Sequence, residues 1–240
     1  MVEAPGGNKA TRRVRGVLLD VDGTLIASNR AHAEAFADVF RDAGHDIPAD
    51  RIERLIGMGG DKLIPELTGL DAEHGEGKRL AEAKKKRFAK HYLSRLKPTP
   101  GARELVQRLR HAGLGFVVAT SASDDEVRGL IAQAGLADLL TEATSSSDAD
   151  NSKPDPDILH AALERARLLP EEAIMLGDTP YDIEAATRAG VACIAVRSGG
   201  WEDAALRGAI AIYDHPADLV AHFDESPLAA SLAGNRTAAR

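Results

Sequence analysis

The hydrophobic and polar residues of this chain alternate in blocks, and the blocks indicate two kinds of element. Short apolar runs are separated by longer amphipathic stretches, several of which end at a glycine. A run that is apolar on both faces is typical of a strand buried within a parallel sheet. Apolar residues three and four positions apart predict a helix, and glycine commonly follows a helix end. The alternation therefore predicts strand–helix–strand units in a parallel sheet with right-handed crossovers.

The predicted strands lie on either side of a long segment that contains no convincing strand. They span residues 15–20, 116–119, 139–143, 173–176, 191–196 and 209–212. Helices between the later strands are expected over residues 102–111, 124–134, 156–166 and 182–189. Helical patterns fill the strandless segment, with Asn29 as the first N-cap, over residues 30–43, 50–56, 61–67 and 73–96.

We therefore predict an α/β fold, a Rossmann-like parallel sheet core flanked by helices, with an inserted all-helical cap domain. The core domain is expected to comprise residues 14–28 and 98–224, and the cap domain residues 29–97. Residues 1–13 and 225–240 have no hydrophobic periodicity, so we expect flexible termini there.

Composition narrows the class of protein. The chain has 240 residues, 44% of them hydrophobic, which is enough for a sizeable core. Its net charge of −7 disfavours nucleic acid or an anionic membrane as a partner, because proteins with such partners usually have a basic surplus. No apolar run approaches the roughly 18 residues of a spanning helix, and Cys193, the only cysteine, leaves no disulfide framework. We expect a cytoplasmic monomer or homodimer.

Two carboxylates follow the first predicted strand. Asp20 and Asp22 come directly after an apolar run and are followed by Gly23 and Thr24. Residues two apart in a strand point the same way, so the two carboxylates start on one side. Such a pair repels unless a cation or a proton lies between them. The same residues are also compatible with a simple strand-end turn, in which Asp-Gly serves only the turn geometry.

Polar side chains follow the other predicted strands as well. They are Thr120 with Ser121, Lys153 in a polar loop, and Asp178 with Asp182. The carboxyl ends of parallel strands converge on one crevice, where open α/β sheets bind their ligands. A cluster of acidic oxygens suits Mg²⁺, whereas hydroxyl groups and a lysine suit a phosphate. Together they are what phosphoryl transfer to a carboxylate requires.

Four segments in this order resemble the signatures of the haloacid dehalogenase superfamily of aspartate-nucleophile phosphohydrolases. They are Asp20-Val21-Asp22-Gly23-Thr24, Val118-Ala119-Thr120-Ser121, Ser152-Lys153-Pro154-Asp155-Pro156-Asp157 and Gly177-Asp178-Thr179-Pro180-Tyr181-Asp182. The helical segment after the first signature resembles the C1-type cap of this superfamily. The branch with that cap includes phosphoglycolate phosphatase and β-phosphoglucomutase.

The resemblance implies a role for each matched residue. Asp20 would be the nucleophile and a Mg²⁺ ligand, and Asp22 would be the general acid and base and would bind the ion through its backbone carbonyl. Thr120 and Lys153 would hold the phosphoryl oxygens. Asp178 would bind Mg²⁺ directly. Asp182 could bind a metal water or orient Lys153, or it could be only an acidic residue in the first turn of a helix, where the helix dipole favours it. Thr24 and Ser121, from the same signatures, are expected to be substrate-binding residues.

The turn at residues 57–62 of the cap is the expected substrate contact, through Gly60 and Lys62. Its Met-Gly-x-x-Lys spacing is similar to that of phosphonoacetaldehyde hydrolase, in which the lysine forms a Schiff base. That enzyme has an alanine at the position of Asp22. The acid in this chain favours cleavage of a P–O bond whose leaving group needs a proton.

Other polar residues have simpler interpretations. The run Lys84-Lys85-Lys86-Arg87 lies in an acid-rich helix and is expected to be a solvated face of the cap. His32 lies near the expected hinge, and its role stays open. For Trp201 two interpretations stay open, namely that it lines the crevice or that it covers the core.

The sequence therefore predicts a Mg²⁺-dependent phosphatase for a small phosphorylated metabolite, acting through an aspartyl-phosphate. The alternatives are a sugar phosphomutase or phosphonate hydrolase with the same core, or a catalytically idle binding protein. The substrate itself is not readable from the sequence.

Overall fold

A parallel sheet of six strands forms the centre of the protein. The computed structural model describes residues 13–141 and 143–230. The strands follow the order β3-β2-β1-β4-β5-β6, and every adjacent pair is parallel. They are β1 Gly16–Leu19, β2 Gly115–Ala119, β3 Ala143–Thr144, β4 Ala173–Gly177, β5 Ala192–Val196 and β6 Ala211–Tyr213. The predicted fold class, an α/β protein with a parallel sheet, is confirmed.

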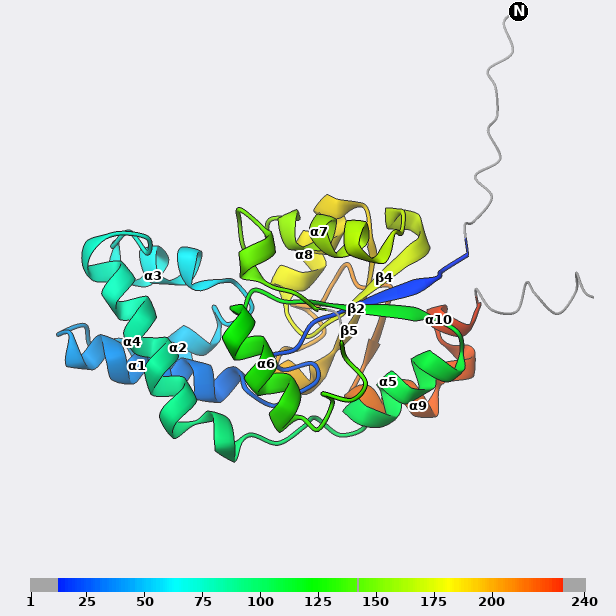
Figure 1. Cartoon of the computed structure of the whole chain (residues 1–240), viewed down its shortest axis with the longest axis horizontal. Helices are drawn as coiled ribbons and strands as arrows, with labels where there is room; N and C mark the ends of the chain where they lie inside the picture. The colour runs from blue at the N-terminus through cyan, green and yellow to red at the C-terminus, as the bar shows by residue number, and fades with distance from the viewer. Residues whose placement is uncertain (1–12, 142, 231–240) are drawn as a thin grey trace, which may run out of the picture.

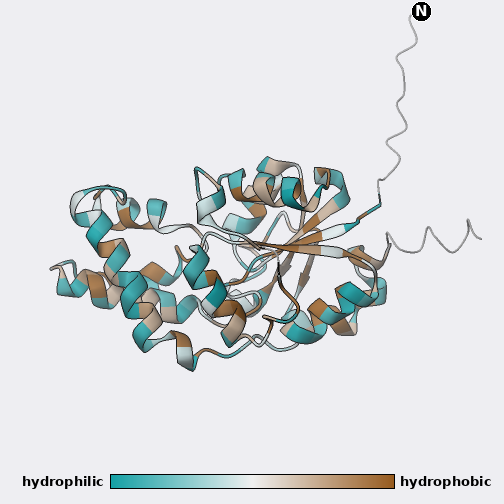
Figure 2. Cartoon of the chain, in the orientation of Figure 1, coloured by the Kyte–Doolittle hydropathy of each residue, from teal (hydrophilic) through white to brown (hydrophobic). Residues whose placement is uncertain are grey.

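Helices cover both faces of this sheet (Figure 1). One face packs against α5 Ala102–His111, α6 Asp124–Gln133 and α9 Pro216–Ala221, and the other against α7 Asp157–Ala166 and α8 Pro180–Ala189. Val17 and Leu19 point into the first layer, whereas Leu18 points into the second. Because successive side chains of a strand point to opposite faces, burial on both sides requires an uninterrupted apolar run. Figure 2 shows the strands as apolar and the helices as amphipathic.

A second group of helices lies between β1 and α5 in the chain, beyond one end of the sheet (Figure 1). It consists of α1 Asn29–Asp42, α2 Ala49–Glu53, α3 Gly60–Thr68 and α4 Gly75–His91, and the 3₁₀ turn Leu93–Arg95 leads back to the sheet. These helices, here called the cap, have a hydrophobic cluster of their own around Phe36, Phe40 and Leu63.

Several boundaries differ from the predictions for physical reasons. Leu139 and Leu140 are buried in the turn after α6, so β3 has only two residues where a strand over 139–143 was expected. The helix predicted over 73–96 ends at His91. Asn29 is the first residue of α1 rather than its cap, and Ser28 precedes the helix without a capping side-chain bond.

The first residues of the expected flexible tail are structured. Ser226 and Leu228 are each 1% exposed, and residues Pro227–Ala230 form the short helix α10. Leu228 belongs to the core cluster beneath α5 and α9, because it supplies apolar area that those helices leave uncovered. The prediction of a flexible terminus from residue 225 is therefore wrong as far as Ala230. Residues 1–12 and 231–240 lie outside the described residues.

Within the described ranges, no helix is both long enough and apolar enough to cross a bilayer.

Candidate active site

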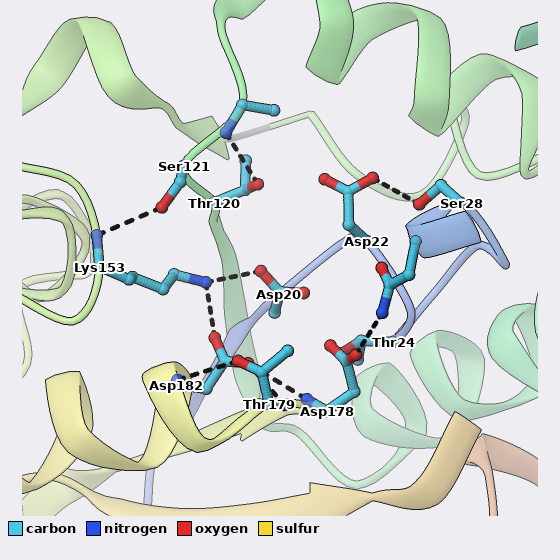
Figure 3. Close-up of polar contacts among 12 residues, drawn as sticks. Asp20, Asp22, Thr24, Ser28, Thr120, Ser121, Lys153, Asp178, Thr179 and Asp182 are labelled. Atoms are coloured by element: carbon cyan, nitrogen blue, oxygen red, sulfur yellow. Dashed lines mark hydrogen bonds and ion pairs between the residues drawn. The ribbon is translucent and has the colours of Figure 1, made fainter. Parts of the chain in front are cut away.

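Loops that follow the parallel strands meet at one edge of the sheet. Asp20 follows β1, Thr120 follows β2, Asp178 follows β4, and Lys153 lies in the loop between β3 and α7. Parallel strands present their carboxyl ends at the same edge, so residues far apart in the sequence become neighbours there. Figure 3 shows these side chains directed toward a common centre.

Lys153 joins two of the carboxylates. Its side chain is fully buried, and its Nζ donates to Oδ1 of Asp20 at 2.6 Å and to Oδ1 of Asp182 at 2.7 Å. Burial alone lowers the pKa of Lys153, but the carboxylates of Asp182 and Asp20 outweigh it and raise that pKa above its usual value. The ammonium is therefore a permanent positive charge beside Asp20.

The first turn of α8 holds Asp182 in place. The helix begins at Pro180, two residues before the predicted start, because Thr179 caps it with a reciprocal pair of hydrogen bonds. The Thr179 hydroxyl accepts from the Asp182 N–H, and Oδ2 of Asp182 accepts from the Thr179 N–H at 3.0 Å. With Oδ1 bound by Lys153, both Asp182 oxygens have protein donors. This supports the role of orienting Lys153, and a direct metal bond to Asp182 stays a prediction.

Asp178 is fully buried and has no cationic partner among the described side chains. Oδ1 accepts from the Thr24 hydroxyl at 3.0 Å, and Oδ2 accepts from the Asn29 amide at 2.8 Å. The backbone closes tightly around it: a Cβ on Gly199 would lie 1.8 Å from Oδ2. Burial, with the nearby carboxylates of Asp20 and Asp182, raises the pKa of Asp178 well above its usual value.

Asp22 points toward the cap and has a different environment. Its Oδ1 accepts from the Ser28 hydroxyl and lies 2.8 Å from Nε2 of His32, both from the start of the cap. His32 stacks on Phe88 of α4, with ring centroids 3.9 Å apart. Burial raises the pKa of Asp22, but the His32 interaction, the Ser28 hydrogen bond and Lys84 outweigh it and lower that pKa to about 2.

Asp20 shows the opposite shift. Burial raises its pKa to about 7, Lys153 opposes that shift, and the carboxylates of Asp182 and Asp22 reinforce it. The raised pKa of a buried acid next to other acids is the electrostatic sign of missing positive charge.

The donor set fits a divalent cation. One carboxylate oxygen from each of Asp20, Asp178 and Asp182 lies within 4.8 Å of the others, and all three residues are buried. Oδ1 of Asn29, beside Asp178, is a buried acceptor with no partner. Buried oxygen ligands with an excess of negative charge suit Mg²⁺. These buried acidic residues could hold a metal ion, and their assignment as Mg²⁺ ligands stays a prediction.

A cavity of about 430 Å³ lies between this edge of the sheet and the cap. Asp20, Asp22, Thr120 and Ser121 line it from the core, and Gly60 lines it from α3. Ser121 and Gly60 were predicted to contact the substrate; both line this cavity, and their role in binding stays a prediction. Oγ1 of Thr120 accepts a turn hydrogen bond from the Ala122 N–H, which leaves its proton free to donate.

Two predicted substrate contacts lie elsewhere. The Thr24 hydroxyl is fully buried against Asp178 and does not line the cavity. The Lys62 ammonium forms an ion pair with Asp155, which also pairs with Arg188 at 2.8 Å, so Lys62 fastens the cap to the core outside the cavity. The structure therefore corrects both expectations: Thr24 positions Asp178, and Lys62 is a contact between cap and core.

Some contributors were missed or left open by sequence reasoning. Asn29 was expected only as a helix cap, although its amide holds Asp178. His32 was noted for its position near the hinge, and that position brings it to Asp22. Lys84 was expected on a solvated face, yet it is 8% exposed. Trp201 packs edge-on against Tyr181 and covers the core cluster rather than lining the cavity.

Comparison with known proteins agrees with this geometry. The model of a family described as haloacid dehalogenase-like hydrolase matches residues 17–196. A phosphoglycolate phosphatase from Rhodospirillum rubrum is 30% identical over 216 residues, which are 85% of this chain and 89% of that protein.

Two further matches come from a longer protein and from a solved structure. Protein SUPPRESSOR OF QUENCHING 1, chloroplastic, from Arabidopsis thaliana is 32% identical over 82% of this chain, although the chain spans only 19% of the plant protein's length. The crystal structure of a hydrolase from Pseudomonas syringae superposes with a TM-score of 0.81 at 27% identity, covering 88% of this chain and 98% of that one.

Proposed function

The chain belongs to the haloacid dehalogenase-like hydrolases, and from this premise we propose that it is a Mg²⁺-dependent phosphatase acting on a small phosphorylated metabolite. The observation that supports the proposal most strongly is the position of Asp20. It is a cavity-lining carboxylate that is bound to a buried lysine and lies beside two further carboxylates that suit a cation.

In the first half-reaction, a carboxylate oxygen of Asp20 forms a bond to phosphorus and the P–O bond of the ester breaks. The leaving oxygen takes a proton from Asp22. Because the pKa of Asp22 is lowered to about 2, its carboxyl group must take up this proton before the P–O bond breaks. Thr120 and Lys153 hold the phosphoryl oxygens.

In the second half-reaction, Asp22 takes a proton from a water molecule, whose oxygen bonds to phosphorus while the bond to Asp20 breaks. Asp20, Asp178 and the backbone carbonyl of Asp22 would hold Mg²⁺, with Asp182 as a further candidate. Bound there, the ion offsets the repulsion between an anionic nucleophile and an anionic substrate.

The test is phosphate release from p-nitrophenyl phosphate and from a panel of metabolite phosphates. Asp20→Asn keeps the shape of the side chain and removes the nucleophile, so we expect loss of turnover in a variant that still unfolds cooperatively. EDTA should abolish activity, and Mg²⁺ should restore it. Asp224→Asn, at an exposed carboxylate remote from the site, is the matched control. An active Asp20→Asn enzyme contradicts the proposal.

The alternatives give different products. In a phosphonate hydrolase of the kind considered from the sequence, Lys62 would form the Schiff base. Lys62 pairs with Asp155 and does not line the cavity, which disfavours this alternative. A phosphomutase would return an isomerised sugar phosphate instead of free phosphate. A binding protein with no catalysis would release no phosphate from any member of the panel.

A further inference from the structure

The part of the cavity beyond the reacting groups is acidic. Asp61 of α3, Glu73 before α4 and Asp150 after β3 all line it, and Glu73 and Asp150 have no side-chain partner among the described residues. Asp61 accepts only a backbone N–H, that of Ser152, at 3.3 Å. Three acidic residues, of which Glu73 and Asp150 are exposed and Asp61 is half-buried, therefore line the space that the leaving group of the substrate must occupy.

Few positive side chains near this space are available to a ligand. Nζ of Lys84 lies 2.8 Å from Glu126, with both side chains only 10% exposed, and 5.1 Å from the ring centroids of Phe36 and Phe88. No arginine is among the described residues that line the cavity. Lys85 is the one lining ammonium without a partner in the described part of the chain. One flexible lysine against three carboxylates leaves the space with a net negative charge.

The remaining surface of the cavity combines apolar and hydroxyl groups. The cap contributes Phe36, Ile56 and Met58. The core contributes Ser146 and Ser152, whose hydroxyl oxygens make no hydrogen bond to the residues that the structure describes. The carbon–hydrogen faces of a ligand can pack against these apolar side chains. Its alcohol groups can form hydrogen bonds with the serines and the carboxylates. A second anionic group on the ligand would lie near like charges without a bidentate partner.

On the basis of the proposed function, we propose that the leaving group is a polyhydroxylated alcohol, such as a sugar or a cyclitol, that has no second anionic group. Carboxylate-bearing and bisphosphorylated substrates are disfavoured by Asp61, Glu73 and Asp150. An amino substituent on the alcohol is compatible with the same carboxylates.

The sharpest test compares sorbitol 6-phosphate with 6-phosphogluconate, which differ only in a terminal CH₂OH or carboxylate. We expect kcat/KM to be at least about tenfold higher for sorbitol 6-phosphate, from repulsion across a partly screened cavity. The ratio should shrink as NaCl is raised, because the discrimination is electrostatic. Equal values, or a preference for 6-phosphogluconate or 2-phosphoglycolate, overturn the inference.

Variants test whether Glu73 and Asp150 cause the difference in kcat/KM between the two substrates. Glu73→Gln combined with Asp150→Asn should raise kcat/KM for 6-phosphogluconate relative to sorbitol 6-phosphate by several-fold. Glu82→Gln, an exposed carboxylate on α4 that does not line the cavity, should leave the ratio unchanged. An unchanged ratio in the double variant contradicts the inference.

The failure of this inference is distinguishable from the failure of the proposed function. Asp20-dependent hydrolysis of p-nitrophenyl phosphate, without hydrolysis of sorbitol 6-phosphate, glucose 6-phosphate or inositol 1-phosphate, overturns only the leaving-group assignment. Absence of phosphate release from every substrate in the presence of Mg²⁺ overturns both.

Discussion

Asp20 and Asp22 are two residues apart, and yet their pKa values are shifted in opposite directions. Burial raises the pKa of Asp20 to about 7, whereas the pKa of Asp22 is lowered to about 2 because His32, Ser28 and Lys84 outweigh its burial. Asp20 lies among carboxylates of the core, and Asp22 lies against groups at the start of the cap. Asp20 is therefore the nucleophile, whose charge needs a cation beside it. Asp22 is the general acid, and it must gain a proton before it can donate one.

The role of Asp22 predicts a dependence on the leaving group. In Asp22→Asn, alkyl phosphates should lose at least about a hundredfold in kcat, because an alkoxide cannot leave without a proton. p-Nitrophenyl phosphate has a far better leaving group and should lose much less in the first half-reaction. Burst and steady-state kinetics on both substrates measure the difference. Equal losses in the burst rate for the two substrates contradict the role.

Lys153 should determine the pH at which kcat/KM falls on the acid side of its profile. Its ammonium lowers the pKa of Asp20, so in Lys153→Met that pKa rises and less of the nucleophile is ionised at a given pH. The acid limb of the profile of kcat/KM against pH should therefore move to higher pH. Lys86→Met, at an exposed lysine on α4, is the control and should leave the limb in place. An acid limb that is unchanged or moves to lower pH in Lys153→Met contradicts this role of the ion pair between Lys153 and Asp20.

At the scale of elements, the strand ends were the most predictable part of the site. An apolar run followed by a polar residue marks where a buried strand stops, so Asp20, Thr120 and Asp178 were located correctly from the pattern alone. Contacts between elements were not readable in this way. The pairing of Lys62 with Asp155 and that of Lys84 with Glu126 depend on how the cap lies over the core, and periodicity within one helix contains no such information.

The turn before α3 brings the cap into close contact with the core. A Cβ on Gly59 would lie 2.1 Å from Oγ of Ser152, whereas a Cβ on Gly60 would meet only Cδ1 of Ile64, at 4.0 Å. Gly59→Ala should therefore prevent the cap from seating and raise KM by about tenfold or more, because the cavity is no longer enclosed. Gly60→Ala should have a clearly smaller effect. Steady-state kinetics and thermal unfolding of both variants separate loss of seating from loss of fold, and equal effects refute the explanation.

At the scale of the whole molecule, the acidic site couples stability to pH and to the metal. Without a metal, the folded-state pKa of Asp20 is about 7, above its ordinary value of 3.8. Its contribution to stability is then fully present below the ordinary pKa and is lost as the pH rises through about 7. The raised pKa of Asp178 acts in the same direction.

Mg²⁺ should reverse this loss because it binds the ionised carboxylates. We predict that saturating Mg²⁺ raises the unfolding temperature more at pH 8 than at pH 5, where protons compete for the same oxygens. In Asp20→Asn the increment and its pH dependence should both shrink. Differential scanning calorimetry with and without Mg²⁺ measures the increment, and an equal or larger increment at pH 5 contradicts the assignment of these residues.

Most of the fold was predictable from the sequence, whereas its shortest strand and its C-terminal residues were not. Alternating apolar runs and amphipathic stretches define the parallel sheet, because a strand covered on both faces leaves a distinctive pattern. The two-residue strand β3 and the buried Leu228 depend on small areas of tertiary packing that a local pattern does not register. The electrostatics of the site likewise depend on the assembled fold. Lys153 contacts Asp20 and Asp182 only because the fold brings these three distant residues together.

The central claim is that the phosphoryl group is transferred to Asp20, and trapping the intermediate tests it most directly. Enzyme with Mg²⁺ would be mixed with a ³²P-labelled substrate that it hydrolyses, and the reaction would be stopped with acid within the first turnover. We predict protein-bound label that is released by hydroxylamine and maps to the peptide containing Asp20, with none in Asp20→Asn. Turnover of the substrate without label at Asp20, or with label on another residue, would contradict the account.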